Sequence, residues 1–276
     1  MRASFHSVGL FRDPVLVALR KAHAAGYAAF ELNAETLPWA GPHVTPATSA
    51  AERAAIVAGA REMGMVIDAV GAHIPMIHAD PKARKASIEF VNGCVALARD
   101  VGAPVVHILS GPLAPNIDRR DAWRWFADAV SAAAQTAVDH DVTLAIEAIV
   151  GHMFRGIDDY HALRRDLPGV PFRINFDPSH LVVHGEDPLR LVAELGGEIV
   201  HVHMKDGAGR YPAFSFPPLG AGEINFGALV EELRKQNYSG SLAVEYEANA
   251  FGYAEPEEEI LRHGKRFLAA FGIDGR

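Results

Sequence analysis

The stretch RINFDPSHLV, residues 173–182, runs from a short apolar segment directly into a turn. Ile174-Asn175-Phe176 has the character of a buried strand, and Asp177 ends it although aspartate is a poor strand residue. A carboxylate at the end of a buried strand must be paired or hydrated. Asp177-Pro178 is also ordinary turn chemistry. The stretch alone therefore leaves two interpretations open, a turn residue and one half of a chemical site.

Similar apolar stretches recur along the whole chain, and long amphipathic segments separate them. The expected strands are ASFHSV (3–8), AAFELN (28–33), VIDAVGAH (66–73), PVVHILS (104–110), TLAIEAI (143–149), FRINFD (172–177), IVHVHMK (199–205) and LAVEYE (242–247). Eight strand–helix units in 276 residues predict a (β/α)₈ barrel. A doubly wound sheet competes, but the Gly-rich dinucleotide turn after its first strand is absent. No linker or composition shift divides the chain, so we expect one domain over residues 1–276.

The segments between the strands carry helix patterns. In DPVLVALRKAHAAG, Asp13-Pro14 predicts the N-cap and the first helical residue, and Gly26 follows the last turn. Residues 118–140 and 225–238 have the same amphipathic character. Residues 207–226 form a long irregular segment, and long loops in compact domains are often lids or binding loops.

Composition and charge restrict the class of protein. Hydrophobic residues make up 49% and charged residues 22%, which is typical of a soluble globular protein. The net charge of −8 would repel the phosphate backbone of a nucleic acid. The single cysteine, Cys94, rules out an internal disulfide, and its apolar helical surroundings predict a buried, inert thiol. Neither a signal-peptide pattern nor an apolar run of membrane-spanning length occurs, so we expect a cytoplasmic enzyme without a membrane partner.

Four consecutive strands end with a ligand-type side chain. These residues are Glu147, Asp177, His203 and Glu245. Active sites of such barrels lie at the carboxyl ends of the strands, and alternation places His201 on the same face as His203. Three neighbouring carboxylates would repel one another unless a cation lay between them. Three carboxylates and one imidazole suit Mn²⁺ first, then Mg²⁺ or Co²⁺, whereas Zn²⁺ usually prefers more His or Cys. Separate salt bridges are the alternative.

The motifs IEA, DPSH, HVHMKD, LGAGEINF and AVEYE together resemble the xylose-isomerase-like family of sugar phosphate isomerases and epimerases. This family includes ketose 3-epimerases, hydroxypyruvate isomerases, inosose dehydratases and C-glycoside deglycosidases. The resemblance implies that Glu147, Asp177, His203 and Glu245 bind the metal and that His180 contacts a substrate oxygen. In the ketose 3-epimerase branch the two glutamates also act as acid and base on opposite faces of the substrate.

The chemistry implied is proton abstraction next to a carbonyl, through an enediolate, in a sugar isomerase or epimerase. Lys205 could neutralise this intermediate or hold a substrate oxygen, and a salt bridge at the barrel rim with Asp206 or Glu223 is the alternative. Two features depart from the ketose 3-epimerase pattern. His152 occupies the region where a further Glu is usual, and the nearest arginine after the strand-seven histidine is Arg210, inside the irregular loop.

A metal-dependent lyase or dehydratase acting on a keto-sugar is the alternative function. Such an enzyme shares the first step and then expels a group, as in β-elimination from a 3-oxo-glycoside, and some relatives work with a small partner subunit. Tyr211, Phe214 and Phe216 in the irregular loop would suit the ring of an aglycone. We expect a homo-oligomer in either case.

The remaining ionisable residues near strand ends predict a polar pocket. His6, Glu31, His73 and His107 would line it and bind sugar hydroxyls. For Glu31 an arginine partner is an alternative, and each histidine could instead be a satisfied structural residue. An apurinic-site endonuclease, from another branch of the superfamily, would need more His and Glu ligands and a basic surface, neither of which is evident. A non-catalytic binding module would be expected to lack part of the ligand set.

Overall fold

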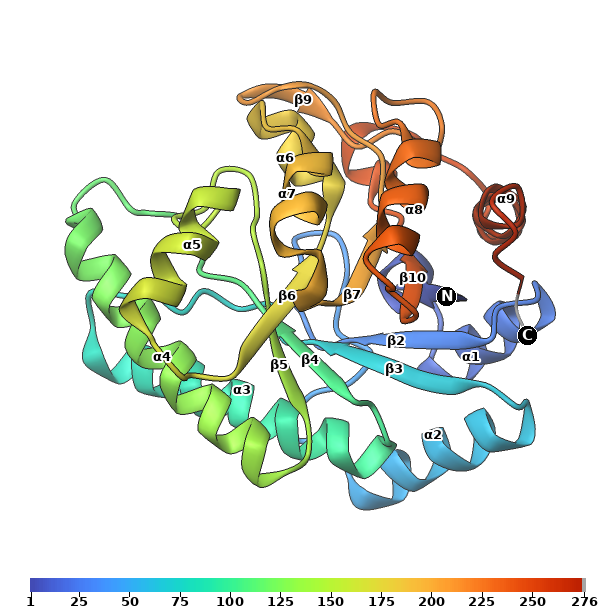
Figure 1. Cartoon of the computed structure of the whole chain (residues 1–276). Coiled ribbons are helices and arrows are strands. Elements are labelled where there is room, and N and C mark those ends of the chain that lie inside the picture. Colours follow the sequence, from blue (N-terminus) through green and yellow to red (C-terminus); the bar gives the residue numbers. More distant parts are fainter. Residues whose placement is uncertain (275–276) are drawn as a thin grey trace.

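The computed structural model describes residues 1–274, and its strands form a closed parallel barrel (Figure 1). The barrel strands are β1 (Arg2–His6), β2 (Ala29–Asn33), β3 (Val66–Gly71), β4 (Val105–Ile108), β5 (Thr143–Glu147), β6 (Phe172–Phe176), β7 (Ile199–Met204) and β10 (Ser241–Val244). Around the barrel their order is β1-β10-β7-β6-β5-β4-β3-β2. Each expected strand is present, so the prediction of a (β/α)₈ barrel is confirmed.

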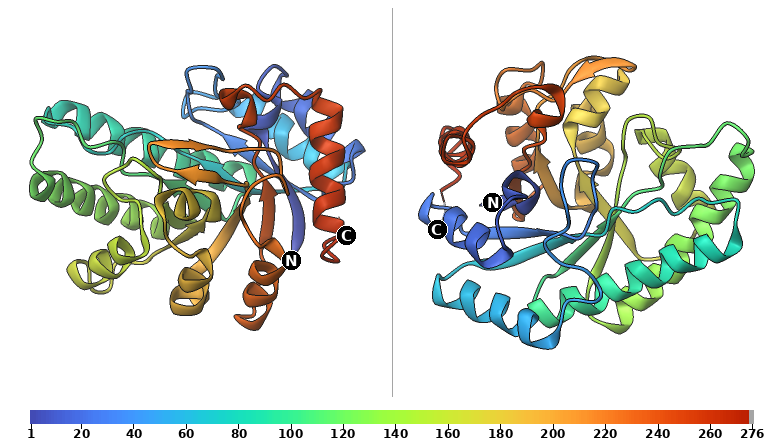
Figure 2. Two further views of the ribbon diagram at one scale, coloured as in Figure 1. Left: turned by 90° about the horizontal axis from the view of Figure 1, so that it is seen from above. Right: turned by 180° about the vertical axis from the view of Figure 1, so that it is seen from behind.

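Helices surround the barrel and connect its strands (Figure 2). They are α1 (Val15–Ala24), α2 (Ala50–Glu62), α3 (Pro81–Val101), α4 (Arg119–Asp139), α5 (Ile157–Asp166), α6 (Pro178–His184), α7 (Pro188–Leu195), α8 (Phe226–Lys235) and α9 (Glu257–Ala269), with short 3-10 turns η1 (Ser7–Leu10), η2 (Gly196–Glu198) and η3 (Ala248–Phe251). Within residues 1–274, no helix combines the length and the apolar character needed to cross a membrane.

The start of α1 differs from the sequence prediction. Pro14 is the N-cap residue and the helix begins at Val15, so the assignment of Asp13 as N-cap is wrong. The carboxylate of Asp13 instead lies 2.6 Å from the ammonium of Lys21, a residue of α1. Gly26 does follow the last turn, with a φ of +91° that an L side chain rarely adopts.

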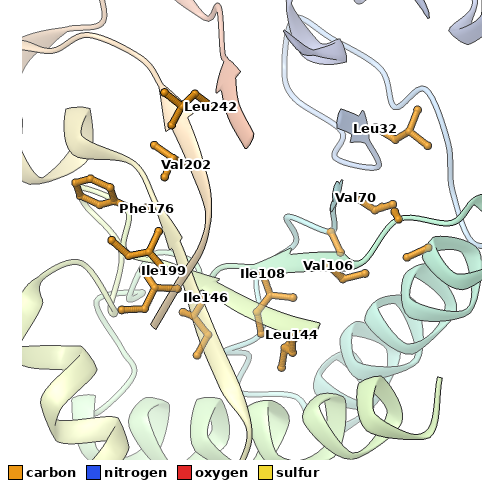
Figure 3. Close-up of a cluster of buried hydrophobic side chains, with 14 of the residues drawn as sticks. Leu32, Val70, Val106, Ile108, Leu144, Ile146, Phe176, Ile199, Val202 and Leu242 are labelled. Atoms are coloured by element: carbon orange, nitrogen blue, oxygen red, sulfur yellow. The ribbon is translucent and has the colours of Figure 1, made fainter. Parts of the chain in front are cut away.

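The hydrophobic core lies outside the barrel, between strands and helices. Figure 3 shows part of this layer, including Val106, Leu144 and Ile146. Cys94 on α3 belongs to the same layer, and burial raises the pKa of its thiol to about 12, in agreement with the predicted inert thiol. Inside the barrel, a small separate apolar cluster contains Ala69, Val105 and Ala145. The rest of the interior is available for polar side chains.

The irregular segment after β7 contains a small hairpin. Strands β8 (Ala208–Arg210) and β9 (Ala213–Ser215) pair antiparallel and lie beside α6 (Figure 1). Asp206 anchors this segment, because its carboxylate accepts N–H groups of Gly220 and Gly222 at 2.9 Å and of Ile224 at 3.3 Å. The loop is therefore tied to the carboxyl end of the barrel, above the expected site.

Candidate active site

Contacts across the barrel identify the side chains that point inward. Glu31 on β2 and His201 on β7 lie 2.7 Å apart (Oε2 to Nε2), although their strands are not neighbours in the barrel. Such a contact can form only through the interior. Alternation along β7 then directs His203 and Lys205 to the same side. The face that the sequence predicts His201 and His203 to share is therefore the inner one, and Lys205 lies on it as well.

A cluster of acidic and imidazole groups lies at the carboxyl ends of four adjacent strands. Glu147 ends β5, His203 belongs to β7, and Glu245 directly follows β10. Asp177 follows β6 and is the N-cap of α6, where its Oδ1 accepts the N–H of Ser179 at 2.8 Å. One ligand-type atom from each of these four residues lies within 4.8 Å of the others, and all four residues are buried. Asp177 is thus a turn residue and also a member of this cluster, which we name the upper cluster.

Two buried atoms of the upper cluster accept no hydrogen bond within residues 1–274, namely Nδ1 of His203 and Oδ2 of Asp177, although the latter lies 2.9 Å from the ammonium of Lys205. The Nδ1 atom lies 3.1 Å from Oε2 of Glu245 and 3.5 Å from Oε2 of Glu147. Buried polar atoms are normally satisfied, so the Nδ1 atom of His203, which faces two carboxylates without a hydrogen bond, indicates a missing partner. Three carboxylates and an imidazole are also a donor set that divalent cations accept. The residues present therefore fit a divalent cation.

Lys205 is the cation that the structure places among these carboxylates. Its buried Nζ lies 2.8 Å from Oε2 of Glu245, 2.9 Å from Oδ2 of Asp177 and 3.0 Å from Oε2 of Glu247. Burial alone would lower the pKa of Lys205, but these carboxylates hold it well above its usual value. The alternative of a rim salt bridge with Asp206 or Glu223 is wrong, because Lys205 pairs with neither among the described residues.

The carboxylates of the cluster differ in their electrostatic environments. Burial would raise the pKa of Glu147 and of Glu245, but the nearby imidazole of His203 helps to hold both well below the usual range. Burial, together with the charges of Glu147 and Glu245, raises the pKa of Asp177 to about 6 despite the neighbouring Lys205. The two glutamates are therefore ionised at neutral pH, and the repulsion between the three carboxylates is expressed in the raised pKa of Asp177.

His180 lies beside the upper cluster on α6. Its Nε2 is 3.5 Å from Oε1 of Glu147 and 3.3 Å from Nζ of Lys205. Burial, reinforced by the charge of Lys205, lowers the pKa of His180 well below its usual value, so the ring is neutral. Its edge packs against Phe216 of the loop after β9, with ring centroids 5.0 Å apart. Phe216 in turn contacts Phe251 of η3, which gives the site an aromatic wall.

A second, deeper layer of histidines surrounds Glu31. His6 and His107 approach its Oε1 at 3.1 and 2.5 Å, and His201 approaches its Oε2 at 2.7 Å. His73 links this layer to the upper cluster, because its Nε2 lies 2.7 Å from Nδ1 of His107 and 3.3 Å from Glu147. The structure therefore brings all of these predicted pocket residues together, but their polar atoms contact one another and do not line an open pocket for sugar hydroxyls.

Within residues 1–274, two further groups of side chains lie close enough together to hold a metal ion. They are His6, Glu31, His107 and His203, and His73, His107 and Glu147. These groups show that further His and Glu side chains lie close together, but they do not test the expectation that the chain lacks the ligand set of an apurinic-site endonuclease. The sequence predicted that His6, Glu31, His73 and His107 line one pocket, but it did not predict which of them contact one another. The net charge of −8 still argues against a DNA-binding surface.

Arg210 is not brought to the cluster. It is exposed on the hairpin and pairs with Glu223 at 2.8 Å. Asn175, by contrast, was not singled out in the sequence, yet its Nδ2 donates to Oε2 of Glu147 at 2.7 Å. Asn175 precedes Asp177 by two residues, so the alternation rule would have placed it on the same face. Tyr160 on α5 also supports the end of β5, and no sequence pattern indicates its role.

A closed (β/α)₈ barrel with an ionisable cluster at the carboxyl ends of its strands is the arrangement found in TIM-barrel enzymes. The family described as xylose isomerase-like TIM barrel matches residues 19–271, and the chain belongs to this family.

Curated relatives are similar at low identity. The L-ribulose-5-phosphate 3-epimerase UlaE of Shigella flexneri serotype 5b is 25% identical over 202 residues, which cover 71% of this chain and 70% of that enzyme. The inosose dehydratase of Clostridium beijerinckii is 25% identical over 169 residues, which cover 53% of this chain and 56% of that enzyme.

Two solved structures share the fold over nearly the whole chain. The 3-keto-D-glucoside 4-epimerase YcjR from E. coli superposes with a TM-score of 0.80 at 16% identity, covering 98% of this chain and 99% of that one. The IOLI protein with a bound zinc atom superposes with a TM-score of 0.81 at 13% identity, covering 99% and 98%. At these identities the likeness concerns the fold.

Proposed function

We propose that this protein is a divalent-metal-dependent sugar isomerase or epimerase that removes a proton next to a carbonyl group and proceeds through an enediolate. The observation that carries the proposal is the upper cluster, with its four ligand-type atoms within 4.8 Å and the buried Nδ1 of His203 that lacks a hydrogen bond. Family membership and epimerase relatives support the same class of reaction.

Glu147, Asp177, His203 and Glu245 would hold the ion. When bound, the ion would supply Lewis-acid stabilisation of negative charge on the oxygens of the intermediate. We propose Mn²⁺ as the first choice, with Mg²⁺ or Co²⁺ as alternatives, because carboxylate oxygens dominate the donor set. A related structure is described with zinc, so Zn²⁺ belongs in any comparison of metals.

The protein's own groups account for the proton transfers. Glu147 and Glu245 come from β5 and β10, which two other strands separate in the barrel, so their carboxylates can flank a flat intermediate. One carboxylate would remove the proton beside the carbonyl and keep it. The other glutamate, ionised at rest, would first take up a proton from water or a substrate hydroxyl and then deliver it to the opposite face to give the epimer. Return of a proton at the neighbouring carbon would give the isomer instead.

Neutral His180 and cationic Lys205 would act on the substrate oxygens. His180 presents Nε2 toward the cluster and can hydrogen-bond a hydroxyl or carbonyl oxygen. Lys205 lies among the same carboxylates and can balance charge that develops on a substrate oxygen. Both side chains are buried, so water is largely excluded where the proton moves.

Proton exchange in deuterated water tests the proposal. The protein is incubated with Mn²⁺ and a panel of ketoses and 3-oxo-glycosides, and NMR follows deuterium at carbon. Deuterium next to the carbonyl of a recovered or epimerised ketose supports enolisation, and Glu245→Gln serves as the matched control that should lose it. Absence of exchange from every carbonyl compound, in protein shown to contain the metal, would refute the proposal.

A lyase acting on a keto-sugar is the second candidate. The aromatic wall of Phe216 and Phe251 beside His180 favours it, because such a wall suits a ring attached to the sugar. The dehydratase relative favours the lyase as well, and so does the pairing of Arg210 with Glu223, a residue outside the cluster. Release of an aglycone from a 3-oxo-glycoside, without exchange into ketoses, would select this alternative.

Other expectations stay predictions. We propose one domain over residues 1–276, a homo-oligomer acting on a small sugar or keto-glycoside in the cytoplasm, and a small partner subunit only for the lyase. Light scattering of the purified chain measures the oligomer directly. A monodisperse monomer at working concentration would refute that part.

A further inference from the structure

Glu31 is the most enclosed carboxylate of the barrel interior. It is 0% exposed, and imidazole nitrogens of four histidines lie within 3.2 Å of its oxygens. These residues are His6, His107, His201 and His203. A buried carboxylate requires such partners. Burial would raise its pKa, but the imidazoles together hold the pKa of Glu31 well below its usual range. Glu31 is therefore a buried anion that accepts hydrogen bonds.

The tautomer of His6 argues against a metal ion bound at Glu31 itself. The N–H of Val8 donates to Nδ1 of His6 at 3.1 Å, so Nδ1 carries no proton. The proton must then lie on Nε2, which faces Oε1 of Glu31 at 3.1 Å. A cation held by that nitrogen would require an imidazolate. The arrangement suits hydrogen bonds donated to Glu31, although its atoms are close enough for an ion.

His203 connects Glu31 to the upper cluster. Its Nε2 lies 3.1 and 3.2 Å from the two oxygens of Glu31, and its Nδ1 faces Glu245 and Glu147. We propose that Glu31 is a positioning residue that keeps the proton of His203 on Nε2 and so directs the lone pair of Nδ1 at the metal. This inference rests on the proposed function, because it assumes that the upper cluster binds a divalent ion.

The other histidines fix Glu31 in turn. His107 and His201 hold one oxygen each, at 2.5 and 2.7 Å, so neither oxygen can rotate away from His203 without breaking a short contact. A carboxylate that accepts the second N–H of a ligating histidine sets the ring orientation and raises the basicity of the ligand. Loss of such a partner typically lowers metal affinity by about 10- to 100-fold.

Glu31→Gln tests the proposal, with Asp68→Asn as the matched control. Both changes replace a buried carboxylate inside the barrel. Asp68 directly precedes Ala69, the β3 partner of Glu31, and lies in a cavity of about 320 Å³ that His201 also lines, but neither of its oxygens makes a hydrogen bond within residues 1–274. Titration calorimetry with Mn²⁺ on protein freed of metal with EDTA gives the affinity of each variant. Melting temperatures with and without Mn²⁺ separate a structural effect from an effect on the site.

We expect Glu31→Gln to weaken Mn²⁺ binding by about 10- to 100-fold. The rise in melting temperature on adding Mn²⁺ should shrink accordingly, whereas Asp68→Asn should keep the affinity of the unmodified protein. A loss of stability in Glu31→Gln without Mn²⁺, with the affinity for Mn²⁺ unchanged, would make Glu31 merely structural and overturn the proposal. Loss of one of two bound ions would make Glu31 a ligand and overturn it as well.

Glu31→Asp provides a second variant if Glu31→Gln does not fold. It keeps the charge that the four imidazoles require and withdraws the oxygens from His203 by one methylene. We expect weakened Mn²⁺ binding again, and unchanged binding refutes the positioning role. If the unmodified protein itself binds none of Mn²⁺, Mg²⁺, Co²⁺ and Zn²⁺, the proposed function fails. If the unmodified protein binds Mn²⁺ tightly and Glu31→Gln binds it equally well, only the positioning role of Glu31 fails.

Discussion

Lys205→Met removes a buried ammonium group and leaves a side chain of similar length. The Nζ atom of Lys205 lies 2.8 to 3.0 Å from carboxylate oxygens of Glu245, Asp177 and Glu247, and the side chain is 3% exposed. Removing one partner of a buried ion pair costs about 3–5 kcal/mol, because the remaining charge stays buried without compensation. We expect the free energy of unfolding, measured in EDTA at pH 8, to fall by about this amount.

The loss should depend on pH. Burial, as the first cause, raises the pKa of Asp177 to about 6 and that of Glu247 to about 7, even beside Lys205. Both groups bind protons more tightly in the folded protein than in the unfolded chain, so their ionisation costs stability as the pH rises through those values. Lys205→Met should therefore lose the full amount of unfolding free energy at pH 8, where both carboxyl groups are ionised. As the carboxyl groups become protonated toward pH 5, the difference from the unmodified protein should shrink.

Lys21→Met is the matched control for this experiment. Its Nζ also pairs with two carboxylates, Asp13 and Glu257, at 2.6 Å, but the side chain is 37% exposed. Exposed pairs contribute only about 0–1 kcal/mol. Urea unfolding followed by circular dichroism measures both variants. Equal losses in the two variants, or no loss in Lys205→Met at pH 8, would refute the argument from burial.

Four other substitutions test the site and its support. Glu147→Gln and Glu245→Gln should each abolish turnover while the circular dichroism spectrum stays unchanged, and activity like that of the unmodified protein in either would remove the proton-transfer assignment. Asp177→Asn should weaken metal binding by about tenfold or more in calorimetry, and unchanged occupancy contradicts its role as a ligand. Tyr160→Phe removes a hydroxyl that accepts the N–H of Ala148 at 3.1 Å and donates to a backbone carbonyl, which should cost about 1–3 kcal/mol. A urea midpoint that corresponds to a loss of less than about 1 kcal/mol in unfolding free energy would show that water replaces the hydroxyl.

The fold was predictable because its pattern is local. Each barrel strand is a short apolar run followed by a helical period, and the barrel follows from the repetition of that unit. The ends of the strands were also informative, since a charged residue such as Asp177 at the end of an apolar run is visible in the sequence. The position of the N-cap of α1 was not, because Asp13 and Pro14 are both compatible with a helix start and only the pairing with Lys21 separates them.

The depth of a side chain within the barrel is not a local property. Alternation places His201 and His203 on one face, but it does not say which lies at the level of Glu147 and which at the level of Glu31. That distinction depends on the stagger of strands on opposite sides of the barrel, and the contact between Glu31 and His201 joins residues 170 positions apart. One of the two alternative partners considered for Lys205, by contrast, could have been excluded from the sequence. Asp206 is the immediate neighbour of Lys205 and must point to the other face, so alternation contradicts a salt bridge between them.

Lys205 and a bound divalent ion would compete for the same oxygens. Oε2 of Glu245 lies 2.8 Å from Nζ of Lys205 and 3.1 Å from Nδ1 of His203, and Oδ2 of Asp177 lies 2.9 Å from the same Nζ. A positive charge so close disfavours a second cation through Coulomb repulsion, and its removal leaves the carboxylates with more charge to offer. Lys205→Met should therefore bind Mn²⁺ at least as tightly as the unmodified protein, although it is less stable in EDTA.

In Lys205→Met the stability in EDTA should therefore fall, while the affinity for Mn²⁺ should stay the same or rise. Calorimetry on metal-free Lys205→Met measures the affinity, and unfolding with and without Mn²⁺ measures how much stability the ion restores. A mere weakening of the fold would instead lower both the stability and the affinity for Mn²⁺. A tenfold loss of Mn²⁺ affinity in Lys205→Met would thus show that the lysine organises the ligands and does not compete with the ion. The carboxylates would then depend on Lys205 for their geometry.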